Sequence, residues 1–457
     1  MNQTLHLKTL EEAKNFILSH SPALFIGSAT STVIPFESLV HLKELDAKTS
    51  LVYTGQLPKS MELVQLSDTR AFLRVTGAIS WLEAKEFLSQ TAFELMTTPT
   101  EELASILSGV ATSATGERSF GFGNLRSQIL SVDMIMGDGQ IRKLNSERSL
   151  DDIFCEFHFS ENDLADIRNY QNEFKQYETF KNAPFPRLMC ETDLATGFEG
   201  QLGLIIGAEI KLKKRTNSTY LFIELDHWAF DFSEHVKLHF ILSDLREKVF
   251  AAELLDAHSL KYLPTELKLK DEKDYVFLEL AQEAFDEVIE ILIQKLESVS
   301  SKLTMEQMFQ MEASKCRALR MAVPRTVFEE NSRKGVTKKG TDIQVAPADF
   351  SKLLSLYQEL AKKGLEYNMF GHFGDAHLHF NFMPKPEQDA KCQELFHQLY
   401  RDIQLLKASP FAEHGIGLLK RKFIASFYSE HQAQVFKILK SKFDPHRQFF
   451  PEGFMQC

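Results

Sequence analysis

Two similar segments, YLFIEL at residues 220–225 and YVFLEL at residues 275–280, constrain the fold of the second half of this chain. Both are rich in aromatic and aliphatic residues, which favour β-strands. Each is followed by a stretch with a helical pattern, and between Phe285 and Leu296 the apolar residues recur every three or four positions. Two strand-plus-helix units predict an antiparallel sheet covered by helices, in an α+β domain of its own.

The first 215 residues have an α/β pattern, and the chain changes character at Lys213-Lys214-Arg215. We therefore expect a domain boundary there, which gives domains over residues 1–215 and 216–457. Within the first domain, Thr98 and Pro99 predict the start of a helix, because threonine is a favourable N-cap and proline is favoured at the first helical position.

Three stretches of small residues interrupt the first domain, at residues 27–32, 109–123 and 197–203. Small residues let backbone N–H groups approach phosphate oxygens, and serine or threonine hydroxyls add further donors. One such stretch is usually a turn, but three in one α/β domain favour a site for a large dinucleotide. No G-x-G-x-x-G motif follows a strand in this sequence. Residues 121–126 come near to it but lack the third glycine, which disfavours a Rossmann NAD site.

Three histidines lie within the stretch GHFGDAHLHFN at residues 371–381. In a strand, His377 and His379 lie on one face, and His372 reaches that face only if Gly374-Asp375 forms a turn. Imidazole suits a zinc-like metal, and two histidines with one carboxylate leave a position open for substrate. A single histidine is more often structural, but three in a glycine-punctuated strand favour a functional site.

A carboxylate and an imidazole adjoin in the stretch AEHGIGLLKR at residues 412–421. On a tight loop both side chains reach one pocket, so that Glu413 completes a metal shell while His414 serves as a general base. The alternative is a glycine-rich turn that precedes an amphipathic helix over residues 414–426.

The composition excludes several classes of protein. Lys plus Arg number 52 and Asp plus Glu number 63, so the net charge is −11, which disfavours nucleic acid or an anionic membrane as the main partner. The five cysteines form no C-x-x-C pair, which indicates reduced thiols in a cytoplasmic protein and offers no ligands for an iron–sulfur cluster. We expect neither a signal peptide nor a membrane span.

Five segments, in order along the chain, together resemble the FAD-linked oxidases that dehydrogenate D-2-hydroxy acids, such as D-lactate dehydrogenase, the flavin subunit of glycolate oxidase and D-2-hydroxyglutarate dehydrogenase. Residues 111–142 resemble the glycine-rich loop, strand and "DG" hairpin of that family. Residues 196–212 resemble its "GSEGTLGI" stretch, and residues 371–381 its "GHxGDGNLHxN" motif. Residues 412–420 resemble "GEHGIGxxK", and residues 443–453 resemble "FDPxxxxNPGK".

The resemblance implies a two-domain α+β flavoprotein. Residues 1–215 are then an α/β FAD-binding domain of the vanillyl-alcohol-oxidase (PCMH) type. Residues 216–457 are then an α+β substrate and cap domain with an antiparallel sheet, whose C-terminal tail returns to the FAD domain. The implied activity is oxidation of a small D-2-hydroxy acid, of the lactate, glycolate or 2-hydroxyglutarate type, to the 2-oxo acid, with hydride passing to flavin N5.

The resemblance also implies roles for individual residues. Among the residues of the second domain and its tail, His372, His379 and Glu413 are then ligands of one divalent, zinc-like metal, His414 is the base, Asn381 contacts substrate, and Arg320 and Lys338 or Lys339 pair with its carboxylate. The residues expected to bind FAD are Gly27, Ser28, Ala29, Thr30, Ser31, Gly109, Thr112, Ser113, Gly116, Gly123, Glu199, Gly200, Leu202 and Gly203. The electron acceptor is left open between oxygen, a quinone, a cytochrome and an electron-transfer flavoprotein.

Two other functions stay open. The family's first loop is usually "RGGGTS", and here Ser28 and Ala29 place Cβ atoms where backbone approaches the pyrophosphate. A divergent or non-catalytic flavin-binding subunit of a larger oxidase complex is therefore the first alternative. A metal-dependent hydrolase that uses His372, His379 and Glu413 alone is the second, but it leaves the three small-residue stretches without a role.

Overall fold

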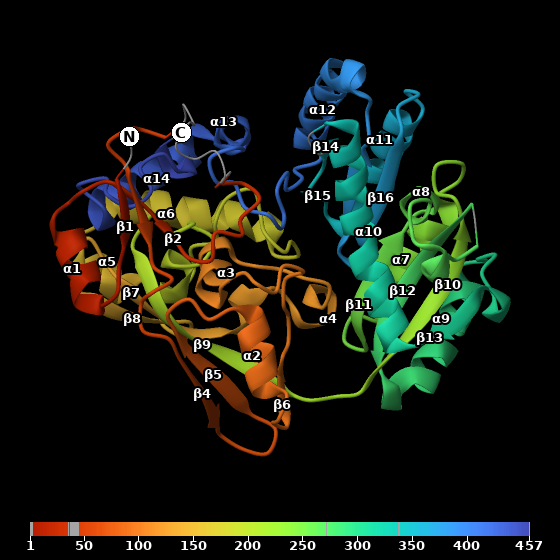
Figure 1. Ribbon diagram of the computed structural model, residues 1–457, viewed down its shortest axis with the longest axis horizontal. Coiled ribbons are helices and arrows are strands. Elements are labelled where there is room, and N and C mark those ends of the chain that lie inside the picture. The colour runs from red at the N-terminus through yellow and green to blue at the C-terminus, as the bar shows by residue number, and fades with distance from the viewer. Residues whose placement is uncertain (1–2, 35, 37–44, 271, 337–338, 457) are drawn as a thin grey trace. The chain divides into compact units, whose positions relative to one another are not determined.

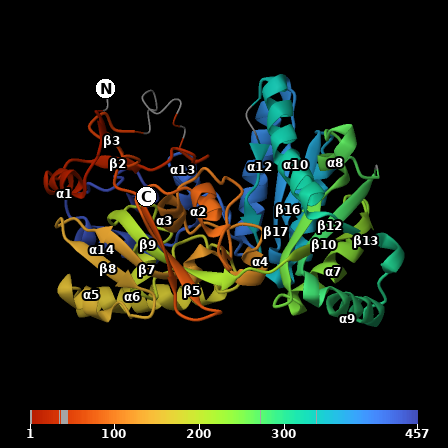
Figure 2. The same ribbon diagram turned by 60° about the horizontal axis from the view of Figure 1, so that its bottom comes forward.

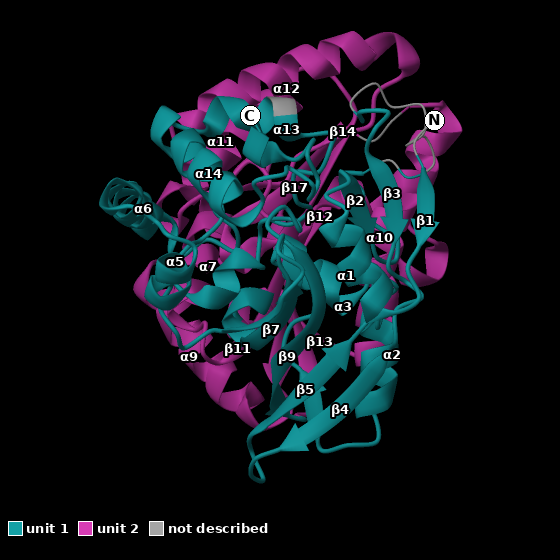
Figure 3. Ribbon diagram, turned by 90° about the vertical axis from the view of Figure 1, so that its left-hand side faces the viewer, with its two compact units in different colours: residues 1–116, 123–215, 413–457 teal, residues 117–122, 216–412 magenta. Residues whose placement is uncertain are grey.

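The structure is a computed structural model that describes residues 3–34, 36, 45–270, 272–336 and 339–456. The chain divides into two compact units, which Figure 3 distinguishes by colour. Unit 1 comprises residues 1–116, 123–215 and 413–457, and unit 2 comprises residues 117–122 and 216–412. The sequence change near residue 215 thus coincides with the division, but residues 117–122 group with unit 2 and residues 413–457 with unit 1.

Unit 1 contains two sheets within its described residues. The small one is parallel, in the order β1-β3-β2. The larger one is antiparallel, in the order β4-β5-β9-β7-β8, with β6 pairing the far end of β9 (Figure 2). The strands are β1 (Thr4–His6), β2 (Ala23–Ile26), β3 (Ser50–Tyr53), β4 (Ser60–Gln65), β5 (Ala71–Thr76), β6 (Phe93–Leu95), β7 (Ile129–Ile135), β8 (Ile141–Asn145) and β9 (Leu204–Lys214).

Several helices of unit 1 begin at a side chain that caps them. The side chains of Ser80, Ser160 and Ser429 each accept a hydrogen bond from the backbone N–H three residues later. The side chain of that later residue accepts a hydrogen bond from the backbone N–H of the serine, which completes a capping box. The helices are α1 (Leu10–Leu18), α2 (Trp81–Leu88), α3 (Ile106–Thr112), α5 (Asp151–Glu156), α6 (Glu161–Phe174), α13 (Arg421–Ile424) and α14 (Glu430–Phe443).

The helix start predicted at Thr98 is wrong. The helix begins at Ile106, and its N-cap is Ser105, whose side chain accepts from the backbone N–H of Ser108. Residues 102–104 instead form a turn and a bend beside the start of α2, where the N–H groups of Trp81 and Leu82 donate to the carbonyls of Ala104 and Glu102. A tertiary pairing thus overrides the local capping signal.

The C-terminal segment completes the core of unit 1. Phe449 packs with Ala13 and Ile17 of α1 and with Val52 of β3. The backbone N–H of Ala23 donates to the carbonyl of residue 448, and the N–H of residue 450 donates to the carbonyl of Ala23, each at 2.8 Å. The last residues of the chain therefore extend the small sheet at its β2 edge.

Unit 2 is built on one antiparallel sheet, which confirms the sheet predicted from the repeated strand segments. The order among the described strands is β13-β10-β12-β11-β16-β17-β14, with β15 also pairing β17 (Figure 1). The strands are β10 (Ser218–Asp226), β11 (Val249–Leu255), β12 (Lys273–Ala281), β13 (Met308–Met311), β14 (Lys339–Gly340), β15 (Ile343–Gln344), β16 (Tyr367–His372) and β17 (His377–Phe382). The helices are α4 (Ser119–Phe122), α7 (Ser233–Asp244), α8 (Ala257–Leu260), α9 (Phe285–Ser298), α10 (Ala313–Lys334), α11 (Phe350–Ala361) and α12 (Asp389–Gln404).

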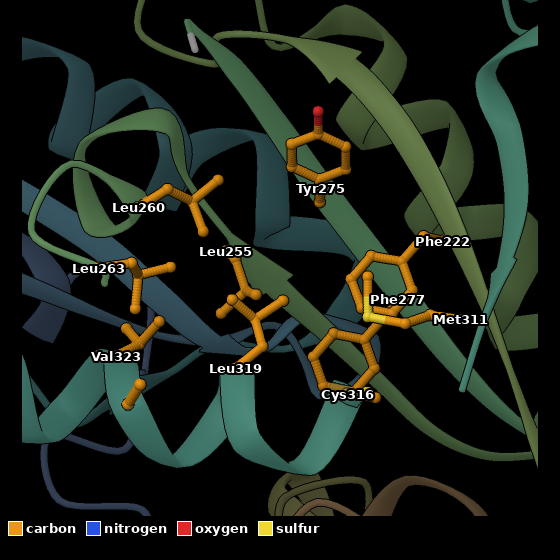
Figure 4. Close-up of a cluster of buried hydrophobic side chains, with 11 residues drawn as sticks. Phe222, Leu255, Leu260, Leu263, Tyr275, Phe277, Met311, Cys316, Leu319 and Val323 are labelled. Carbon is orange, nitrogen blue, oxygen red and sulfur yellow. The ribbon is translucent and has the colours of Figure 1, made fainter. Parts of the chain in front are cut away.

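The two similar segments of the sequence are neighbouring strands. Tyr220 of β10 lies opposite Glu279 of β12, and the pairing runs the full length of both. Phe222 and Phe277 of these strands form a buried cluster with Leu319 and Val323 of α10 (Figure 4). At roughly 1.5–3 kcal/mol for each large apolar side chain buried, this cluster fixes α10 on the sheet.

Candidate active site

A cavity in unit 1 lies where the three small-residue stretches of the sequence come together. Its lining includes Gly27 after β2, Ser108 of α3, and Gly200 and Gly203 before β9. It has an empty volume of about 680 Å³, including space open to solvent. The other lining residues are Leu24, Phe25, Thr54, Leu57, Gly77, Ala78, Ser105, Leu107, Ala111, Glu199, Leu204, Ile205, Ile206 and Phe450.

Close packing makes Gly27 necessary at this cavity. A Cβ atom on residue 27 would lie 2.7 Å from the hydroxyl oxygen of Ser108 and 3.0 Å from that of Ser105. These two hydroxyl groups are hydrogen-bonded at 2.7 Å. Backbone, hydroxyl groups and apolar side chains together suit a ligand with both phosphate and ring parts, so the residues present fit FAD.

Only part of the predicted FAD set lines the cavity. Gly27, Glu199, Gly200 and Gly203 do so. The ten others predicted but outside the lining are Ser28, Ala29, Thr30, Ser31, Gly109, Thr112, Ser113, Gly116, Gly123 and Leu202.

Several of those ten have a visible packing or backbone role. Gly109 packs on Trp81, and a Cβ on Gly116 would lie 2.0 Å from the carbonyl oxygen of Thr98. Ser113 and Ala29 both have positive φ, of 53° and 56°. Ala29 therefore occupies a left-handed conformation that costs a non-glycine residue roughly 1–2 kcal/mol.

Glu199 holds the loop that follows the candidate base. Its carboxylate accepts hydrogen bonds from the backbone N–H groups of Ile416, at 2.6 Å, and Gly417, at 3.0 Å. Burial raises the pKa of Glu199, and these two donors partly offset that effect. Gly415 has φ of 74°, and a Cβ there would lie 2.8 Å from Glu199 Oε1. The segment next to His414 is therefore fixed at a position that only glycine fits.

The three histidines of residues 371–381 converge in unit 2. Residues 373–375 form the turn that the sequence required, and His372 at the end of β16 lies opposite His377 at the start of β17. The ring centroids are 5.2 Å apart for His372 and His377, 4.8 Å for His377 and His379, and 6.0 Å for His372 and His379. All three side chains are at least nine-tenths buried.

Hydrogen-bond acceptors orient the rings of His372 and His379. Nδ1 of His372 lies 2.6 Å from a carboxylate oxygen of Glu253, and Nδ1 of His379 lies 3.0 Å from the carbonyl oxygen of Thr341. In both rings Nδ1 is therefore the donor, and Nε2 is the nitrogen that carries the lone pair. This is the support that metal-binding histidines usually have.

Asp342 also belongs to this site. Its carboxylate lies 2.9 Å from Nε2 of His377, and one ligand atom from each of Asp342, His377 and His379 lies within 4.8 Å of the others. The backbone N–H of Ala412 donates to the carbonyl of Asp342 at 2.9 Å, and the chain continues directly into Glu413. Nothing in the sequence near Asp342 marks it as a site residue.

A second missed group surrounds Arg320 of α10. The guanidinium of Arg320 pairs with the carboxylate of Glu117, and the adjacent Arg118 binds both carboxylate oxygens of Glu279. Burial raises the pKa of Glu117 to about 7, although Arg320 acts to lower it. Burial also acts to raise the pKa of Glu279, but Arg118 lowers it overall. Both arginines of this group are thus paired with carboxyl groups, of which Glu279 is buried and Glu117 is half-buried.

The remaining predicted substrate residues have other contacts. Lys339 of β14 pairs with Asp389 at 3.1 Å, and Lys338 lies outside the described residues. Asn381 is fully buried in β17, and its amide donates to the side-chain oxygen of Asn368 at 3.0 Å. His414 is half-buried in unit 1.

The chain is similar to known proteins in both sequence and fold. Residues 232–452 match the family described as FAD linked oxidases, C-terminal domain. The chain belongs to the FAD-linked oxidase family. The solved structure of an alkyldihydroxyacetonephosphate synthase superposes on 98% of this chain and 76% of its own with a TM-score of 0.65, at 12% identity, which shows the shared two-domain α+β fold.

Curated relatives of this FAD-linked oxidase are distant. The D-lactate dehydrogenase [cytochrome] of Kluyveromyces lactis is 22% identical over 86% of the chain and 63% of its own length. The D-2-hydroxyglutarate dehydrogenase of Danio rerio is 26% identical over 74% of the chain and 57% of its own length. The chain therefore spans about 60% of the length of these relatives. In the part of the chain that the structure describes, none of the helices is long and apolar enough to cross a membrane.

Proposed function

We propose that this chain binds FAD in the unit 1 cavity and oxidises a D-2-hydroxy acid, of the lactate, glycolate or 2-hydroxyglutarate type, to the 2-oxo acid. The supporting observation is that residues of three small-residue stretches, far apart in the sequence, line one cavity. Relatives whose names specify D-lactate and D-2-hydroxyglutarate dehydrogenases support the same class of substrate. Bound FAD would supply the hydride acceptor.

The protein residues then have to bind the acid and remove its hydroxyl proton. We propose His414 as the base, because its position is fixed by the Glu199 contacts to the next residues. We propose that His372, His379 and Glu413 hold one divalent metal ion, since an acceptor at Nδ1 fixes the ring of each histidine with its lone pair on Nε2. A cation beside the hydroxyl oxygen stabilises the negative charge that forms there. Arg320 and Lys339 stay the candidates for the substrate carboxylate, and each would have to exchange its present carboxylate partner, Glu117 or Asp389, for the substrate.

FAD binding is tested by cavity filling. At free FAD about 100 times Kd, the parent should gain about 2.7 kcal/mol of stability, or roughly 5–10 °C in Tm, and show flavin absorbance after gel filtration. Ala78→Trp puts a large side chain into the lining and should abolish both effects. Ala92→Trp, at an exposed position of the same unit, is the control and should behave as the parent. A parent protein without an FAD-dependent shift would contradict the proposal.

One observation favours the second candidate, a flavin-binding subunit without turnover. The guanidinium of Arg320 already pairs with Glu117, which competes with a substrate carboxylate. Because burial raises the pKa of Glu117 to about 7, that carboxyl is neutral below this pH and ionised above it. Competition by Glu117 should therefore be weak in mild acid and strong in mild base.

This competition gives a pH-dependent prediction. In the parent, the KM for a D-2-hydroxy acid should rise as pH increases through 7. Glu117→Gln removes the charge, so its KM above pH 7 should be lower by roughly 10–100-fold, the value of a charge-assisted hydrogen bond of about 1.5–3 kcal/mol, and nearly independent of pH. Glu329→Gln is the matched control, because it alters an exposed carboxylate on α10, the helix that carries Arg320. A Glu117→Gln protein that stays inactive with every acid would support the non-catalytic candidate.

A further inference from the structure

A second histidine and carboxylate cluster lies in unit 2, outside the site described above. His227 directly follows β10, and Asp256 and His258 lie where β11 passes into α8. One ligand atom from each of these three residues lies within 4.8 Å of the others. His227 and Asp256 are buried, whereas His258 is half-buried, so an ion has access from the His258 side.

Acceptors fix the orientation of both rings. Nδ1 of His227 lies 2.8 Å from a carboxylate oxygen of Asp274, and Nδ1 of His258 lies 3.2 Å from the backbone carbonyl oxygen of Tyr367. Each Nδ1 is therefore the donor, and each Nε2 has a lone pair to offer. Nε2 of His227 lies 3.1 Å from the hydroxyl oxygen of Tyr367 and accepts a hydrogen bond from it. A metal ion bound at Nε2 would replace this hydrogen bond, and the Tyr367 hydroxyl oxygen would then lie close to the ion.

The charges of the cluster also favour a cation. Asp256 and Asp274 are both fully buried. Asp274 is compensated by His227 and His235, at 2.8 and 3.1 Å, and by two backbone N–H groups. Asp256 accepts from the indole of Trp228 and from the N–H of Ser259, but no lysine or arginine within the described ranges forms an ion pair with it. These donors are neutral, so a divalent ion would add a cationic partner to this buried carboxyl group.

We propose that His227, Asp256 and His258 bind a divalent transition-metal ion of the zinc type at a site separate from the His372 cluster. Zinc bonds of about 2.0–2.1 Å place tetrahedral ligands roughly 3.4 Å apart, so the three side chains need only small rotations to close on the ion. The site joins the end of β10 to α8 and, through Asp274 and Tyr367, to β12 and β16. Its role is therefore structural, and it stabilises one end of the sheet.

Cobalt(II) reports on this site without any need for FAD or activity. The full chain is prepared with His377→Ala and His379→Ala, which remove two imidazoles of the other cluster. This background should bind one cobalt ion per chain and lose it when His258→Ala is added. In His258→Cys, a thiolate-to-cobalt charge-transfer band should appear, because the new sulfur contacts the ion. His397→Cys, at an exposed histidine of α12, is the matched control and should show no such band.

Two results would overturn the site. One is a background protein that binds no cobalt ion. The other is full cobalt binding in His258→Ala together with no new band in His258→Cys. If the background variant does not fold, the same comparison is made in the parent, where His258→Ala should lower the cobalt stoichiometry by one. Failure of the proposed oxidase activity would leave all of these readouts unchanged.

Discussion

Substituting His414 by asparagine should slow the reduction of bound flavin by a D-2-hydroxy acid by roughly 10²–10⁴-fold, the usual value of a general base. Asparagine keeps the size and polarity of the side chain but accepts no proton. Flavin and metal content should be unchanged, because Glu199 holds the following residues through their backbone N–H groups. Anaerobic stopped-flow absorbance measures the rate, and His431→Asn, which alters a histidine paired with Glu173 in the same unit, is the control.

Other outcomes would assign His414 differently. Loss of one metal equivalent in His414→Asn would make it a ligand rather than a base. A rate within a few-fold of the parent would mean that the proton leaves by another route. His377 is then the nearest candidate, because it is central to the histidine cluster of unit 2.

Removing His379 should release about one equivalent of bound metal and abolish turnover. His379 belongs both to the ligand set expected from the family resemblance and to the geometric group with Asp342 and His377. Elemental analysis in the His258→Ala background measures this metal alone, since that change removes the second proposed site. His397→Ala should retain the metal.

The same measurement separates the two ligand sets. If the metal is held by His372, His379 and Glu413, then His372→Ala loses it and His377→Ala keeps most of it. The reverse pattern would assign the ligands to Asp342, His377 and His379, and His372 would then only support the site through its contact with Glu253. Retention of the metal in His379→Ala would refute both sets.

The elements that the sequence predicts well are those whose pattern is local. The helix from Phe285 and the strands around residues 220–225 and 275–280 all form as expected, because their apolar spacing matches the face that they bury. The turn at residues 373–375 is likewise confirmed, since Gly374 permits close approach to Phe120. Local chemistry was sufficient in each case.

The site residues that the sequence did not predict depend on contacts between distant segments. Glu117 meets Arg320 although they are about two hundred residues apart in the chain, and Asp342 meets His377 across separate strands. Single carboxylates of this kind have no spacing that would distinguish them from exposed ones. For the same reason, Thr54 at the unit 1 cavity could not be identified from a motif.

The pairing of Ala23 with residues 448–450 affects how unit 1 folds while the ribosome is still making the chain. At roughly 5–20 residues per second, strand β2 leaves the ribosome at least about 20 s before the segment that covers its edge. Residues 216–412 are complete before that segment, so unit 2 is able to fold while unit 1 still waits for its last partner. An uncovered strand edge invites pairing with other chains. A fragment that ends at residue 215 lacks the segment that covers this edge, and it should aggregate rather than fold.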